Sequence, residues 1–426
     1  MEKQLYDSYL DILKEELVPA MGCTEPIAIA YAAALARDTL GCMPEKTLLQ
    51  VSGNIIKNVK SVVVPNTGGR RGMRTAVAAG LCFGIAEKEL EALASASDEN
   101  IRQLDEYLQT ADITIEEAKS NHPFDLAVTL HAGDDEAYVH IVSHHTNVVC
   151  IRKNDEVLLE KPYSEESVQA PENRSLLTVE RIVEFANEVA IDDVRDILKR
   201  QIDFNLAISK EGLTGKYGAG IGKILLLSYG NSVHNRAKAW AAAGSDARMD
   251  GCEMPVVINS GSGNQGLTAS IPVIVYAQEC AVSDALLYRA LVVSNLVTIH
   301  LKTGIGSLSA YCGATSAGAG AGAGICYLYG GGYEEIAHTI VNAVAINSGM
   351  ICDGAKASCA AKIASAVESG LLGMRMNMHD SQFYGGDGIV VTGVENTIRA
   401  VSSIARDGMR GTDEEVIRLM MQTERI

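Results

Sequence analysis

Three of the ten cysteines stand in turn-like contexts where a thiolate could serve as a metal ligand or a nucleophile. Cys23 lies in GCTEP, just before an alanine-rich helical stretch whose first amides favour a thiolate. Cys312 lies in SAYCGATSAG between small residues, and Cys352 lies in SGMICDGAKASC beside Asp353. A free cysteine is ordinarily buried in a core, and the sequence has no C-x-x-C pair. Spacing alone therefore does not diagnose a metal site.

A loop of small residues, NSGSGNQGLTASIPV at 259–273, leads into an apolar helix. Such a loop presents backbone N–H groups to an anion, and Asn264 and Gln265 add side-chain donors. A substrate carboxylate or a phosphate would fit there. The alternative is a plain helix cap.

A second loop, NTGGRRG at 66–72, repeats this design. It begins with Asn66, and its arginines Arg70 and Arg71 can pair with a carboxylate. The alternative is a simple strand-to-helix turn.

Candidate bases are found near the end of an apolar helix, in TIHLKTG. Either His300 or Lys302 could accept a proton, or Lys302 could only cap the last helical turn. Lys356, four residues after Cys352, is a further candidate. The sequence alone does not decide among them.

The composition limits the classes of protein to consider. The chain has 426 residues, 47% of them hydrophobic, and a net charge of −17. The acidic excess is concentrated in residues 81–200, and it disfavours nucleic acid and anionic membranes as partners. A disulfide scaffold is not expected in so long and apolar a chain. The acidic, amphipathic N-terminus is unlike a targeting peptide, so we expect a reducing cytoplasm.

Two charge-free stretches, between Glu253 and Glu279 and between Lys302 and Glu334, are long enough to cross a membrane. Their content favours buried helices instead, because they hold many Gly, Ser and Thr residues and the polar NSGSGNQG loop.

The periodicity predicts an α+β fold in three parts. Residues 1–45 form N-terminal helices that pack on the C-terminal domain. Residues 46–165 form an inserted α+β domain with strands that include TLLQVS, SVVVP, DLAVTL, EAYVHIV, NVVCIR and EVLLE. Residues 176–426 form a mostly α-helical C-terminal domain. Its repeated alternation of Gly and Ala indicates closely packed helix backbones or a glycine-lined cavity.

Four motifs carry a resemblance to a known family: MGCTEP at 21–26, INSGSGNQGLTASIPV at 258–273, KTGIGSLSAYCGATSAG at 302–318 and SGMICDGAKASC at 348–359. Together they resemble the L-cysteine desulfidases over essentially the whole chain. That family is itself similar to the α-chain of iron–sulfur L-serine dehydratases, here over roughly 250–400.

The resemblance implies a [4Fe–4S] cluster held by Cys23, Cys312 and Cys352, in a helical, serine-dehydratase-like catalytic domain. In the dehydratases the third cysteine follows soon after the second, so Cys359 is an alternative to Cys23. GCTEP, which the desulfidases share, favours Cys23. A homodimer is also expected from the resemblance.

The implied reaction is β-elimination of L-cysteine to pyruvate, ammonia and hydrogen sulfide, with deamination of L-serine as a related activity. Three thiolates leave one iron open as a Lewis acid. Asn264, Gln265 and neighbouring amides, including that of Gly266, would hold the substrate, with contacts from Ser307, Ser309, Asn66 and Arg70. Lys302 is our first choice of base.

Two other functions remain open at this point. A pyridoxal-phosphate lyase would use SGSGNQG for the phosphate and Lys302 or Lys356 for the Schiff base. A non-catalytic small-molecule binding protein would use the glycine-rich cavity and would not need the three cysteines.

Overall fold

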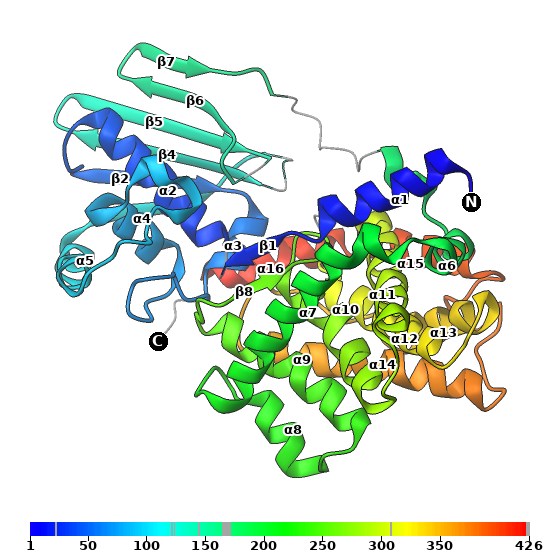
Figure 1. Cartoon of the computed structure of the whole chain (residues 1–426). Helices are drawn as coiled ribbons and strands as arrows, with labels where there is room; N and C mark the ends of the chain where they lie inside the picture. The colour runs from blue at the N-terminus through cyan, green and yellow to red at the C-terminus, as the bar shows by residue number, and fades with distance from the viewer. Residues whose placement is uncertain are drawn as a thin grey trace.

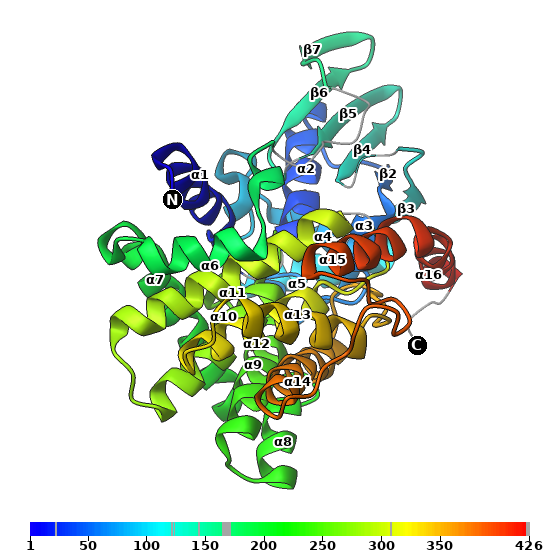
Figure 2. The same cartoon turned by 90° about the vertical axis from the view of Figure 1, so that its right-hand side faces the viewer.

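The computed structural model describes residues 1–21, 24–120, 122, 124–143, 145–163, 172–306 and 309–422 (Figure 1). The fold is α+β and mostly helical, as predicted. Two separate hydrophobic cores organise it: a large one among helices and a smaller one between helices and a sheet. Figures 1 and 2 show the sheet unit standing on one side of a broad helical body.

The helical body is built around α11 and α12, which pack on each other and on several neighbours. A two-stranded pairing of β1 with β8, Pro19 opposite Val257, ties the chain after α1 to this body. Its elements are α1 (Lys3–Glu16), β1 (Pro19–Met21), η2 (Glu172–Leu176), α6 (Val179–Glu188), α7 (Ile191–Thr214), α8 (Ile221–Tyr229), α9 (Val233–Met249), β8 (Pro255–Val257), α10 (Gly263–Glu279), α11 (Asp284–Ile305), α12 (Gly313–Leu328), α13 (Tyr333–Ile346), α14 (Ser358–Met378), α15 (Val394–Ser403) and η3 (Ile404–Gly408).

The sheet unit has the strand order β3-β2-β4-β5-β6-β7. Only β2 and β3 run parallel; the other neighbours are antiparallel. Its elements are α2 (Thr24–Leu40), β2 (Lys46–Val51), α3 (Gly53–Val59), α4 (Gly72–Phe83), η1 (Ala86–Glu91), α5 (Asp98–Thr110), β3 (Asp112–Glu117), β4 (Asp125–Ala132), β5 (Asp135–Val142), β6 (Val148–Lys153) and β7 (Glu156–Glu160). The last helix, α16 (Arg410–Gln422), returns to pack on α3.

The packing of α2 differs from the prediction for residues 1–45. Helix α1 does pack on the helical body through Tyr9, Ile12 and Leu13. Helix α2 instead lies against β4, β5 and α4, and its apolar residues belong to the smaller core. The reason is its composition: α2 is apolar around most of its circumference, so it is buried between a sheet and another helix.

Another difference concerns the segment before the NTGGRRG loop. SVVVP at 61–65 was expected to be a strand, but only Val63 pairs, in a single bridge to Arg71. The short helix α3, which the sequence pattern did not predict, precedes it. This helix contributes residues to the wall of the main cavity.

The alternating Gly and Ala of α12 bring helix backbones into contact, as predicted. A Cβ atom added to Gly322 would lie 2.5 Å from the carbonyl oxygen of Gly370 on α14, and one on Gly318 would overlap the carbonyl of Ala366. Glycine is required at such approaches because any side chain would separate the helices.

Among the described helices, α11 alone is long and apolar enough to cross a membrane by length and composition. Its apolar window is 67% buried, and the helix lies at the centre of the helical body (Figure 1). This burial is what a core helix shows.

Candidate functional site

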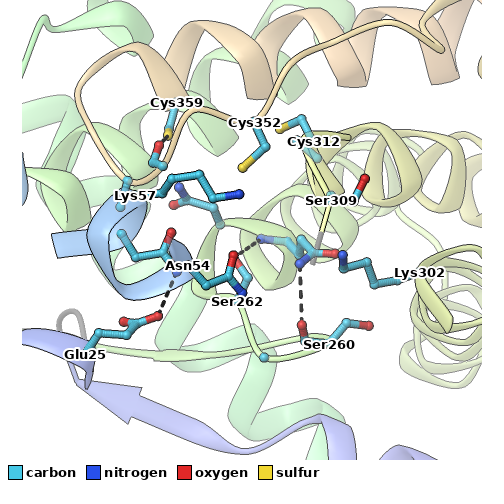
Figure 3. Close-up of a pocket in the computed structure, with 18 of the residues that line it drawn as sticks. Glu25, Asn54, Lys57, Ser260, Ser262, Lys302, Ser309, Cys312, Cys352 and Cys359 are labelled. Carbon is cyan, nitrogen blue, oxygen red and sulfur yellow. Dashed lines mark hydrogen bonds between the residues drawn. The ribbon is translucent and has the colours of Figure 1, made fainter. Parts of the chain in front are cut away.

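A cavity of about 670 Å³ lies between the sheet unit and the helical body. The sheet unit contributes residues of α2, α3 and the β5–β6 connection, and the helical body contributes the ends of α10, α11, α12 and α14. Figure 3 shows Cys312, Cys352 and Cys359 along one side of this cavity and Glu25 on the opposite side. The site therefore needs both units.

Cys312 and Cys352 are brought together by one antiparallel bridge. Tyr311 pairs with Ile351, the backbone N–H of Cys312 donates to the carbonyl oxygen of Met350 at 3.0 Å, and that of Cys352 donates to Ala310 at 2.5 Å. Residues that lie diagonally across such a pairing have side chains within reach of each other. The two cysteines are 40 positions apart in the sequence, and this short pairing makes them neighbours in the cavity wall.

The Cys312 and Cys352 thiol groups shift each other's pKa values in opposite directions. The neighbouring Cys312 thiol, with the positive charge of Lys57, lowers the pKa of Cys352 to about 5. The interaction with Cys352, together with burial, raises the pKa of Cys312 well above its ordinary value. Cys352 is therefore the thiol of the pair that is more readily converted to the thiolate, the form that binds metal.

Cys359 is the third described cysteine in the cavity wall. It lies in the first turn of α14, its thiol donates to the carbonyl oxygen of Gly354 at 3.4 Å, and burial raises its pKa. Cys23 lies outside the described residues, but the next residue, Thr24, lines the cavity and its Oγ1 hydrogen-bonds to His145 Nε2 at 3.0 Å. Among the described residues no three His, Cys, Asp or Glu side chains are grouped to hold a metal ion.

The NSGSGNQG loop lines the opposite part of the cavity. Ser260 and Gly261 both have positive φ, which makes a tight turn between Asn259 and Ser262. Ser262 then caps α10, its Oγ accepting the backbone N–H of Gln265 at 3.4 Å. The helix N-terminus thus faces the cavity, where its amides favour an anion.

Asn264 and Gln265 line the cavity, as the prediction requires. The Oδ1 atom of Asn264 and the Oε1 atom of Gln265 are buried without a hydrogen-bond partner in the part of the chain described. Buried polar atoms usually have partners, so these two are the kind of groups that a ligand satisfies. Gly266 is different: it does not line the cavity, and a side chain there would overlap the carbonyl of Val257. It serves close packing.

A buried amide network fixes the start of this loop. The Nδ2 atom of Asn259 donates to Oδ1 of Asn295 at 2.9 Å, and Asn295 exchanges two hydrogen bonds with Gln201 at 2.8 and 3.0 Å. All three side chains are fully buried. The network holds the loop rigidly to α7 and α11, and such positioning favours binding and catalysis.

Lys302 reaches the cavity from the end of α11. Its Nζ donates to the carbonyl oxygen of Gly306 at 2.6 Å, so it does cap the helix. Burial lowers its pKa, although the nearby Cys352 and Cys312 sulfurs oppose this effect. A lysine with a lowered pKa has more of the neutral amine that a base requires.

His300, the alternative base, points elsewhere. Its Nε2 hydrogen-bonds to Glu395 at 2.8 Å and it lines a second cavity of about 480 Å³. Lys356 forms an ion pair with Asp353 and does not line the main cavity. Ser309 does line it, but its Oγ already donates to the carbonyl oxygen of Ala405 and accepts from the N–H of Tyr311. Ser307 lies outside the described residues.

The structure does not bring Asn66 and Arg70 to the cavity. Asn66 has a φ of 58° in the turn after Val64, and the Arg70 guanidinium is paired with Asp105 of α5. The NTGGRRG loop is therefore a structural turn, which was the alternative interpretation of its sequence.

The sequence analysis missed Lys57. This residue of α3 lines the cavity with its side chain only 2% exposed, and it forms an ion pair with Asp413. Its only sequence signal is a lysine in the apolar stretch NIIKNV, which is a weak one.

The cavity is cationic in an acidic protein. Among the described residues that line it, the charged side chains other than histidine and cysteine are Lys57, Arg174, Arg248, Lys302, Lys362, Glu16 and Glu25. Five cations against two carboxylates contrast with the net charge of −17 of the chain. A cavity of this kind attracts a small anionic molecule.

Comparison with known proteins identifies the family of this chain. The serine dehydratase alpha chain family matches residues 61–418, a longer stretch than the motifs alone suggested. A UPF0597 protein from Desulfitobacterium hafniense is 55% identical over 99% of this chain and 98% of its own length. A UPF0597 protein from Treponema denticola is 46% identical over 99% of both chains, and one from Shewanella sp. (strain ANA-3) is 37% identical over 99% of this chain and all of its own.

The family match begins after α3 and ends in α16, so it includes the NSGSGNQG loop, Lys302 and both cysteines, whereas the α2 and α3 residues of the cavity lie outside it. A lyase or dehydratase role follows from it. The chain belongs to the serine dehydratase alpha chain family.

Proposed function

We propose that this protein is an iron–sulfur-dependent amino-acid lyase that converts L-cysteine to pyruvate, ammonia and hydrogen sulfide, with L-serine as a second substrate. The observation that carries the proposal is the Cys312–Cys352 pair, which the Tyr311–Ile351 bridge brings together in the wall of a cationic cavity. The family match supports the reaction class, and the substrate and cofactor are our own proposal.

Cysteine thiolates are the usual ligands of an iron–sulfur cluster, which supports this choice of cofactor. Cys312 and Cys352 would supply two thiolates from the cavity wall, and we assign the third to Cys23, the residue before Thr24 of the cavity wall. Cys359 is the alternative third ligand. When bound through three thiolates, a [4Fe–4S] cluster supplies a Lewis-acidic iron to the β-substituent of the substrate.

The substrate's carboxylate is held at the start of α10. Backbone N–H groups beyond Ser262 face it, and the side-chain amides of Asn264 and Gln265 add donors. The Nε2 atom of Gln265 already donates to the carbonyl oxygen of Ser260 at 3.5 Å, and its second N–H is left for the substrate. A bound amino acid would also give the unpartnered Asn264 Oδ1 and Gln265 Oε1 an ammonium group to accept from.

Lys302 removes the α-proton as a neutral amine. With the departure of the β-sulfur as sulfide, the electron pair of the broken C–H bond forms the double bond of 2-aminoacrylate. This product tautomerises to the imine, which water hydrolyses to pyruvate and ammonia. L-Serine would follow the same course, with hydroxide in place of sulfide.

The first part of the test measures iron and acid-labile sulfide in protein purified without oxygen. The second part measures the release of sulfide and pyruvate from L-cysteine and of pyruvate from L-serine. We expect about four irons per chain in the wild type and none in Cys23→Ala/Cys312→Ala/Cys352→Ala. The matched control Cys42→Ala/Cys150→Ala/Cys280→Ala changes three cysteines outside the cavity and should keep its iron. Iron-free wild type with no product from either amino acid would refute the proposal, and Cys359→Ala identifies the third ligand.

A further inference from the structure

Lys57 occupies an unusual position for a lysine. It lies in the middle of α3, on the sheet unit, and its side chain extends through a buried region toward Cys352 (Figure 3). The backbone carbonyl of Lys57 touches the loop after Cys352 so closely that a side chain on Gly354 would overlap it. The ammonium group is therefore fixed at the reacting end of the cavity, from the side opposite the helical body.

The last helix of the chain holds Lys57 in place. Asp413 of α16 accepts a hydrogen bond from Lys57 Nζ at 2.5 Å, and Asp413 is itself only 13% exposed. The side chain of Ile417, one turn further on, occupies the space that a side chain on Gly53 of α3 would need. Two contacts, one ionic and one apolar, thus connect α16 to α3, and a buried charge requires such pairing.

Three of the four other described cations of the cavity make contacts that hold the protein's own structure together. Lys362 donates to the carbonyl oxygen of Ile351 at 2.6 Å and pairs with Asp353. Arg174 pairs with Glu15 and Glu16, and Lys302 caps α11. Lys57 has three N–H donors, and Asp413 takes one of them. The remaining donors lie beside the cavity.

The short distance between the carboxylate and the leaving group of the substrate determines which part of the substrate lies near Lys57. In cysteine or serine the carboxylate carbon is only three bonds from the sulfur or oxygen that leaves. A substrate whose leaving group lies against Cys312 and Cys352 must therefore place its carboxylate within a few bond lengths of the same wall. Lys57 is fixed there, while the N-terminus of α10 faces the cavity from the other unit.

We propose that Lys57 binds the substrate's carboxylate, opposite the N-terminus of α10, and that Asp413 is the positioning residue that holds Lys57 there. The proposal rests on the proposed amino-acid lyase function and adds the residue that selects a free α-carboxylate. It also gives the C-terminal helix a role: without α16 the ammonium group would lose its fixed position.

The test is calorimetric binding of L-alanine, which has no leaving group, and of L-alaninamide, which has no carboxylate charge, to anaerobically purified protein. The variants are Asp413→Asn and Lys57→Met/Asp413→Asn; the double change removes both charges, so no buried charge is left unpaired. We expect the wild type to prefer L-alanine about tenfold or more, the double variant to lose that preference, and Asp413→Asn to lose part of it. The control Glu414→Gln alters the neighbouring, 72% exposed residue of α16 and should bind like the wild type.

Kinetics with L-cysteine separate positioning from general damage. Asp413→Asn should raise KM about tenfold with little change in kcat, and Asp413→Glu should restore KM. A double variant that keeps the full preference for L-alanine overturns the assignment of Lys57. A wild type that binds neither compound and releases no sulfide from L-cysteine overturns the proposed function, and this assignment with it.

Discussion

Cys312 and Cys352 lie together in the cavity wall and shift each other's pKa values, although the two residues belong to different loops of the helical body. The relationship depends on two backbone hydrogen bonds around the Tyr311–Ile351 bridge and on the start of α12 at Gly313. The interaction lowers the pKa of Cys352 and raises that of Cys312, so Cys352 is the better metal-binding thiol of the pair.

Alkylation of the apoprotein tests this relationship. With a pKa of about 5, Cys352 should react with iodoacetamide at pH 6 nearly as fast as at pH 8, measured by mass spectrometry of the labelled peptide. Cys312→Ala removes the neighbouring thiol that lowers the pKa of Cys352, so this pKa should rise and the labelling of Cys352 at pH 6 should fall severalfold. The exposed Cys280 serves as internal reference. Equal pH dependence at Cys352 and Cys280 would contradict the assignment.

Replacing the proposed base should affect the chemical step and leave binding intact. Lys302→Met is expected to lower kcat for L-cysteine by about 10²-fold or more, while the affinity for L-alanine stays within about threefold. Lys302→Arg should not restore activity, because a guanidinium group stays protonated. The surface variant Lys199→Met, which breaks an exposed ion pair with Asp203, is the matched control. A near-normal kcat in Lys302→Met would exclude this lysine as the base.

Sequence patterns predicted those features of the site that are formed by residues close together in the sequence. The helix start after NSGSGNQG, the turn-like setting of Cys312 and Cys352, and the close backbones of α12 each depend on residues within one short segment. Periodicity also gave most helices and strands, and hence the α+β class.

The contributions from distant segments were not predictable in this way. The ion pair of Lys57 with Asp413 joins residues 356 positions apart, and neither has a distinctive local motif. Arg70 appeared to be an anion ligand because its partner, Asp105, lies on another helix. The alanine-rich α2 was assigned to the wrong core because an all-apolar helix has no single face that identifies its partner.

The close approach of α12 and α14 predicts a large effect from a small change. Gly322→Ala places a methyl group 2.5 Å from the carbonyl oxygen of Gly370, a backbone atom that cannot move independently. We expect a loss of about 1–3 kcal/mol in the free energy of unfolding, measured by chemical denaturation. Gly411→Ala in α16 has open space around the new methyl group and should be neutral or slightly stabilising. Equal stabilities for the two variants would refute the close contact.

The burial of the Asp246 carboxyl group predicts how the free energy of unfolding depends on pH. Its side chain is 1% exposed, and burial raises its pKa from 3.8 to about 6, although its Oδ2 accepts the N–H of Gly222 at the start of α8. Between these two pKa values the folded protein keeps a proton that the unfolded chain releases. The Asp246 contribution to stability therefore falls as pH rises from about 4 to about 6, by up to about 3 kcal/mol.

Asp246→Asn keeps an oxygen acceptor for Gly222 and has no charge to bury. The variant should therefore be more stable than the wild type at pH 7.5 and of similar stability at pH 4, as measured by urea denaturation at both values. Asp203→Asn, which changes an exposed carboxylate of α7, supplies the control for the loss of one negative charge. If Asp246→Asn changes the free energy of unfolding by the same amount at pH 4 and at pH 7.5, the Asp246 carboxylate does not titrate between these two pH values in the folded protein. The difference between variant and wild type depends on pH only where the folded state holds a proton that the unfolded chain releases.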